Sequence, residues 1–95
     1  MEERTILQKF FDIFSKNMHM ISYGVDGTRK ALEMAAVDDF IVIYELVSEE
    51  VLDELTDLAE DSRARIHLVT DKTPEGVQFK GLGGIGAILR YPIGN

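Results

Sequence analysis

The stretch Phe40-Ile-Val-Ile-Tyr44 decides the fold of this chain. Every residue in it is β-branched or aromatic, and these residue types favour strands. Polar residues do not alternate with apolar ones, so we expect a strand that is covered on both faces, as in a parallel sheet. The acidic pair Asp38-Asp39 comes just before it and is interpreted as a break between the strand and the preceding helix.

Helical patterns lie on both sides of this strand. The first helix is expected within residues 3–18, where apolar residues repeat at helical spacing: Ile6, Leu7, Phe10, Phe11, Phe14 and Met18. A second helix is expected from Val25 to Ala36. A third follows Ser48, whose hydroxyl is a favourable N-cap. A short fourth helix is expected after Thr73-Pro74, because Thr caps well and Pro suits the first helical position.

Further strands are expected at Met20–Tyr23, Ile66–Thr70 and Gly86–Tyr91, with a Gly83-Gly84 turn before the last one. Helix and strand therefore alternate along the whole chain, with short connections. This alternation predicts an α/β fold with helices on both faces of a mostly parallel sheet. At 95 residues and 45% hydrophobic content, we expect one domain that covers residues 1–95.

The composition restricts the class of function. The net charge is −7, from 10 basic and 17 acidic residues, which disfavours direct binding of a nucleic-acid backbone. The absence of cysteine excludes disulfides, thiolate metal sites and thiol catalysis. The start, Met1-Glu-Glu-Arg-Thr, does not resemble a signal peptide, and no apolar run approaches the roughly 20 residues of a membrane span. We therefore expect a cytoplasmic protein domain with no membrane association.

No motif indicates an enzyme, a metal site or a cofactor. The glycine-rich run Gly81–Gly86 precedes a strand, whereas phosphate-binding loops precede a helix, so it is interpreted as a structural turn. His19 and His67 lack other ligands at metal-binding spacing, so we expect a surface or hydrogen-bonded role for each. The acidic residues between Glu49 and Asp61 are interpreted as the solvated face of a helix, with a surface for a basic partner as the alternative.

The aromatic residues of the first helix allow two interpretations. Phe10 and Phe11 point about 100° apart, so one narrow helical stripe cannot bury both of them together with Phe14. Packing in the core is one interpretation, and partial contact with a partner is the other.

Two blocks of sequence resemble the third domain of the class-1 peptide chain release factor of eukaryotes and archaea. The first is Tyr23-Gly-Val-Asp-Gly-Thr-Arg-Lys-Ala-Leu-Glu-Met-Ala-Ala-Val-Asp38, which leads into the Phe40–Tyr44 strand. The second comprises Glu75-Gly-Val-Gln-Phe79 and Gly83-Gly-Ile-Gly-Ala-Ile-Leu-Arg-Tyr91. Ala35 stands where the family usually has Gly. The resemblance implies a three-layer αβα sandwich with a mixed sheet, similar to the kink-turn-binding ribosomal proteins.

The resemblance also implies a protein-interaction domain in translation termination. Such a domain docks a translational GTPase, contacts an ABC-type recycling ATPase and reaches the ribosome as part of the full-length factor. The residues that would form the GTPase-docking surface are Phe10, Phe11, Phe14, Ile21 and Tyr23. The Gly-Gly-Gln loop and the Asn-Ile-Lys-Ser motif are absent from this sequence, so we expect an excised C-terminal domain that neither releases peptide nor reads codons. The small inserted subdomain of eukaryotic members is also absent, which favours the archaeal type.

Two alternatives stay open at this point. One is the third domain of the ribosome-rescue protein Pelota, a related but poorer match over Gln78–Gly86. The other is an RNA-binding module of the kink-turn type with the same fold, against which the charge of −7 argues.

Overall fold

The computed structural model describes the backbone of residues 3–93 and the side chains of residues 5–93. Helices and strands alternate through these residues in the expected order. The α-helices are α1 (Glu3–Lys16), α2 (Val25–Glu33), α3 (Glu49–Asp61) and α4 (Pro74–Gly81), and the strands are β1 (Ile21–Tyr23), β2 (Val37–Ile43), β3 (Arg65–Val69) and β4 (Ile85–Leu89). Two short 3-10 helices, η1 (Met18–Met20) and η2 (Tyr44–Leu46), follow α1 and β2.

The strands form a single mixed sheet in the order β1-β4-β2-β3. Only β2 and β3 pair in parallel, while β4 runs antiparallel to both of its neighbours, so the expectation of a mostly parallel sheet is wrong. The reason is where β4 begins. The amide of Ile43, at the end of β2, donates to the Gly84 carbonyl just before β4, at 2.7 Å. The chain thus re-enters the sheet beside the end of β2, at the same end of the sheet where β3 finishes, so β4 runs antiparallel to β2.

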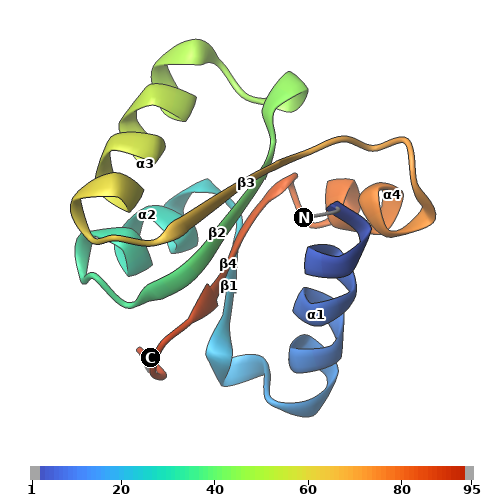
Figure 1. Cartoon of the computed structure of the whole chain (residues 1–95), viewed down its shortest axis with the longest axis horizontal. Helices are drawn as coiled ribbons and strands as arrows, with labels where there is room; N and C mark the ends of the chain where they lie inside the picture. The colour runs from blue at the N-terminus through green and yellow to red at the C-terminus, as the bar shows by residue number, and fades with distance from the viewer. Residues whose placement is uncertain (1–2, 94–95) are drawn as a thin grey trace.

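The sheet separates two layers of helices, with α2 and α3 on one face and α1 and α4 on the other (Figure 1). The interior strand β2 supplies side chains to both layers: Phe40 and Val42 pack in the cluster beneath α2 and α3, and Ile41 and Ile43 in the cluster beneath α1 and α4. All four are fully buried. The αβα sandwich and the doubly covered strand are therefore confirmed.

The start of β2 differs from the sequence expectation. Asp38 and Asp39 lie inside the strand rather than before it, and the register with β4 shifts between Val37 and Asp39. An aspartate is tolerated there because Asp39 is buried against cationic side chains of neighbouring elements. Tyr44, expected at the end of the strand, instead begins η2.

Helix α2 also ends earlier than expected, because Ala35 adopts a left-handed conformation with φ of 55°. The amide of Ala36 then donates back to the Ala31 carbonyl at 3.0 Å, which is the long hydrogen bond of a Schellman ending. Glycine adopts this conformation without the steric cost that an alanine side chain incurs.

We predict that Ala35→Gly raises the free energy of unfolding by about 0.5–1 kcal/mol. The substitution removes the steric strain of the left-handed Ala35, and this gain exceeds the free-energy cost of the greater flexibility that glycine gives the unfolded chain. Thermal and urea denaturation measure the change. The same substitution at Ala59, inside α3, serves as the control and should destabilise the domain by about 1–2 kcal/mol, because it lowers helix propensity and removes a buried methyl group. A melting temperature that falls for Ala35→Gly would contradict the strain argument.

Candidate functional site

The aromatic side chains of α1 divide between the core and the surface. Phe10 is fully buried, and its ring packs edge-on against Phe79 with the centroids 5.1 Å apart. A Cβ placed on Gly86 would lie 3.0 Å from both of these rings, so the glycine of β4 makes room for them. Phe11 and Phe14 are only half-buried. The divergence of Phe10 and Phe11 that helical geometry predicts is therefore present.

Phe14 joins α1 to the edge strand β1. Its ring stacks on Tyr23 with a centroid separation of 5.6 Å and an angle of 22° between the planes. Tyr23 is 49% exposed, and Met18, in the turn between the two elements, is 60% exposed. We call Phe11, Phe14 and Tyr23 the aromatic face. Of the residues expected at the docking surface, Phe10 and Ile21 instead belong to the core, because both pack in the buried cluster between the sheet and the layer of α1 and α4.

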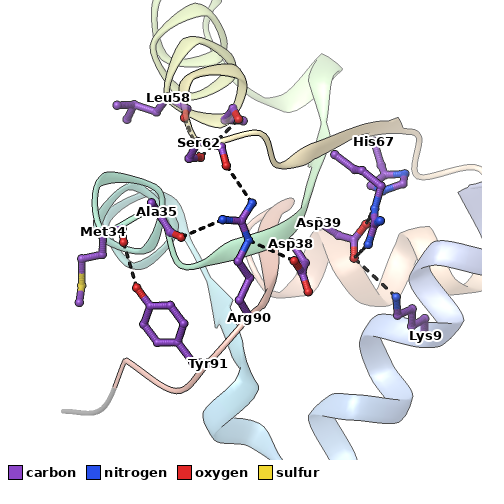
Figure 2. A network of polar contacts seen from close by, with 12 residues as sticks. Lys9, Met34, Ala35, Asp38, Asp39, Leu58, Ser62, His67, Arg90 and Tyr91 are labelled. Atoms are coloured by element: carbon purple, nitrogen blue, oxygen red, sulfur yellow. Dashed lines mark hydrogen bonds and ion pairs between the residues drawn. The ribbon is translucent and has the colours of Figure 1, made fainter.

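A second cluster surrounds a buried carboxylate on the same side of the sheet. Asp39 is 1% exposed. It accepts hydrogen bonds from Arg65 Nε and His67 Nε2, at 2.8 and 2.9 Å, and Lys9 Nζ lies 3.6 Å away (Figure 2). These side chains line a shallow cavity of about 270 Å³ together with Thr5 and Ile6. His67 is thus a hydrogen-bonded side chain, as the sequence suggested.

The electrostatics of this cluster favour the ionised carboxylate. Burial raises the pKa of Asp39, but the hydrogen bonds from Arg65 and His67 and the charges of Lys9 and Arg65 outweigh it. The net effect lowers the pKa from 3.8 to about 2. A carboxylate with a lowered folded-state pKa stabilises the fold above its ordinary pKa, and this contribution is lost as the pH falls through the folded-state value.

We predict that the wild-type free energy of unfolding falls by about 2 kcal/mol more than that of Asp39→Asn between pH 5 and pH 2. Urea denaturation across this range measures the difference. Asp57→Asn, on the exposed face of α3, is the control and should follow the wild-type curve. Parallel curves for the wild type and Asp39→Asn would show that the Asp39 carboxylate does not stabilise the fold.

Arg90 and Tyr91, which follow β4, bind the C-terminal ends of α2 and α3. Arg90 donates to the carbonyls of Ala35 and Ser62, at 3.3 and 2.8 Å, and pairs with Asp38 at 3.1 Å (Figure 2). The hydroxyl of Tyr91 donates to the Met34 carbonyl at 3.1 Å. Helix C-termini carry partial negative charge, so a guanidinium there is favourable. This pair therefore has a structural role in the fold.

The acidic helix α3 presents its carboxylates to solvent. Every acidic side chain from Glu49 to Asp61 is exposed. Glu54 is held by Arg29 of α2 through two hydrogen bonds of 2.8 and 3.0 Å, and the bond from Arg29 lowers the pKa of Glu54. The interpretation as a solvated helix face fits this arrangement.

Two further properties concern the described side chains, residues 5–93, and the described helices. Within this part of the chain, no three histidine, aspartate or glutamate side chains gather in a way that could hold a metal ion. None of the helices described there has both the length and the apolar character needed to cross a bilayer.

Comparison with known protein families identifies the family to which this chain belongs. The family model for eRF1 domain 3 matches residues 1–93. The chain belongs to the eRF1 domain 3 family. This confirms the resemblance to the release factor's third domain that the two sequence blocks carry.

Individual relatives come from two branches of this family. The Pelota homolog of Methanocaldococcus jannaschii is 32% identical over 92 residues, covering 97% of this chain and 26% of the relative. The peptide chain release factor subunit 1 of Thermococcus kodakarensis is 32% identical over 138 residues, covering 97% of this chain and 33% of the relative. A structure described as ribosome-bound archaeal Pelota and ABCE1 matches with a TM-score of 0.82 and 28% identity, covering 96% of this chain and 26% of that one. The chain therefore spans between a quarter and a third of these proteins.

The alignment lengths separate the two branches. The alignment to the archaeal release factor spans 138 residues although this chain has 95, so that relative carries additional residues within the aligned region. The alignment to Pelota spans 92 residues and needs no such insertion. Absence of the insertion therefore does not distinguish archaeal from eukaryotic release factors, and it is a feature shared with Pelota.

Proposed function

We propose that this chain is a protein-interaction domain of cytoplasmic translation termination and ribosome rescue, and that it docks a translational GTPase through the aromatic face. The observation that carries the proposal is the half-exposed Tyr23 ring stacked on Phe14, on a domain of the eRF1 domain 3 family. The domain has no catalytic step of its own in this proposal. Its contribution is to hold partner proteins of the translation apparatus.

The geometry of the aromatic face suits a binding hot spot. Tyrosine is enriched among the residues that dominate protein interfaces, because it offers a large apolar ring and a polar hydroxyl. Stacking on Phe14 restricts the Tyr23 ring before any partner arrives, so less side-chain entropy is lost on binding. Phe14 is in turn held edge-on by the buried Phe10, with centroids 6.0 Å apart. The buried Phe10 ring thus orients the stacked pair of Phe14 and Tyr23 at the surface.

We predict that Tyr23→Ala weakens binding to the archaeal elongation-factor-like GTPase by about 30-fold, equivalent to about 2 kcal/mol. Isothermal titration of the purified proteins measures the dissociation constants. Tyr44→Ala is the matched control, because Tyr44 is a similarly exposed tyrosine (41%) in η2, outside the aromatic face. Equal affinity of wild type and a folded Tyr23→Ala variant would remove the aromatic face from the interface.

The second candidate is the Pelota branch of the same family, and the 92-residue alignment, which leaves no room for a long insertion, favours it. On this candidate the domain serves ribosome rescue, together with an ABC-type recycling ATPase of the kind named beside ribosome-bound Pelota. The reading frame upstream of Met1 decides between the two. A Gly-Gly-Gln loop encoded there would identify a release factor, and a frame that continues upstream through further domains without this loop would identify the rescue factor. Neither candidate requires the domain itself to bind nucleic acid, in keeping with its net charge of −7.

A further inference from the structure

The edge strand β3 has an open side. It pairs with β2 on one side and is the last strand of the sheet, and no strand among residues 3–93 pairs with its other side. A strand in this position offers backbone amides and carbonyls that a further extended segment can pair with. It lies at the opposite end of the sheet from β1, and therefore away from the aromatic face.

The two faces of β3 differ in chemistry. Arg65 and His67 point to the side of α1, where they meet Asp39 and Lys9 at the cavity described above. Leu68 points to the opposite side, which it shares with Ile66. Ile66 packs partly against the core beneath α2 and α3, whereas Leu68 is 54% exposed.

The α1 side of this edge retains positive charge. Lys9 and Arg65 both lie against the single carboxylate of Asp39, and their side chains are 50% and 65% exposed. The charge of Asp38 also acts on Arg65, but Asp38 is itself paired with Arg90 at 3.1 Å, so the two carboxylates face three cations. Asp39 also fixes the direction of the Arg65 guanidinium through two hydrogen bonds, at 2.8 and 3.3 Å. The result is a preorganised, locally basic cavity in a chain whose net charge is −7.

We propose that the β3 edge binds an extended segment of a partner protein by strand addition, and that this segment alternates acidic and apolar side chains. Alternate residues of an added strand face opposite sides of the sheet. The acidic side chains meet Lys9 and Arg65 above the cavity, and the apolar ones cover Leu68 and the exposed part of Ile66. The positive charges of Lys9 and Arg65 thus favour acidic residues on one face of the added segment, and the exposed Leu68 favours apolar residues on its other face.

The test uses the whole 95-residue chain and a capped peptide of alternating sequence, Glu-Val-Glu-Val-Glu-Val-Glu. Its control is a peptide of the same composition in blocks, Glu-Glu-Glu-Glu-Val-Val-Val. Titration followed by amide NMR gives affinity and location, and hydrogen exchange of the β3 amides reports strand addition. We expect saturable binding of the alternating peptide, with slower exchange of amides between Arg65 and Val69, and at least about tenfold weaker binding of the block peptide.

Two surface variants test the two faces separately. Lys9→Gln and Leu68→Thr should each weaken binding of the alternating peptide by about fivefold or more, whereas Lys30→Gln, on the exposed part of α2, should leave it unchanged. Both test residues are at least half exposed, so the variants should fold. No binding at millimolar peptide, equal binding of the block peptide, unchanged β3 exchange, or unaltered affinity in both variants would each overturn the proposal.

Discussion

Replacing Phe10 with alanine is expected to lower the free energy of unfolding by about 3–5 kcal/mol. The ring is fully buried and has three aromatic neighbours, Phe11, Phe14 and Phe79. It also fills the space left open by Gly86, so truncation leaves a cavity between α1 and the sheet. Loss of the ring removes both apolar burial and edge-on aromatic contacts.

Urea denaturation of the purified variant measures this loss. Phe11→Ala is the matched control on the same helix, and it should cost about 1–2 kcal/mol because its ring is only half-buried. A loss below about 1 kcal/mol for Phe10→Ala, accompanied by weaker GTPase binding, would place Phe10 at the interface instead of in the core.

Ile41→Ala is expected to cost about 2–5 kcal/mol, and Ile43→Ala a similar amount. Both residues are fully buried in the central strand β2 and face the layer of α1 and α4. Leu68→Ala provides the contrast on the edge strand β3, where the side chain is 54% exposed and the expected loss is below about 1 kcal/mol. Losses under about 0.5 kcal/mol at both isoleucines would show that β2 is not interior.

Local patterns in the sequence were sufficient for the order of elements. The helix caps at Ser48 and Thr73 are formed as expected, since their hydroxyls accept from the amides of Val51 and Gly76 at 3.2 and 3.0 Å. The unbroken apolar run around Ile41 indicated a doubly covered strand, because each face needs its own layer of helices. Caps and periodicity act over a few residues, so a single sequence reveals them.

The features that sequence reasoning missed depend on contacts between distant segments. The direction of β4 follows from its meeting with the end of β2 at Gly84, a contact across 41 positions of the chain (84 − 43). Asp39 looked like a strand break because its partners Arg65 and His67 lie on another strand. One signal was available: Arg65 and His67 are two residues apart, so they share one face of β3.

The candidate site was predicted in part. The diverging rings of Phe10 and Phe11 follow from helical geometry alone, and the structure shows that Phe10 is the buried one. Which ring turns inward depends on Gly86 and Phe79, which lie more than sixty residues further along the chain. The stacking of Tyr23 on Phe14 likewise depends on how β1 lies against α1, which sequence spacing does not specify.

The most direct test of the proposed function is to titrate the isotope-labelled domain with the unlabelled translational GTPase and map the amide signals that shift or broaden. We expect the affected amides to cluster on the outer side of α1, in η1 and in β1, around Phe14, Met18 and Tyr23. The Tyr23→Ala variant should lose most of these changes at the same protein concentrations. Changes confined to the acidic helix α3, with the signals of α1 and β1 unaltered, would contradict docking through the aromatic face.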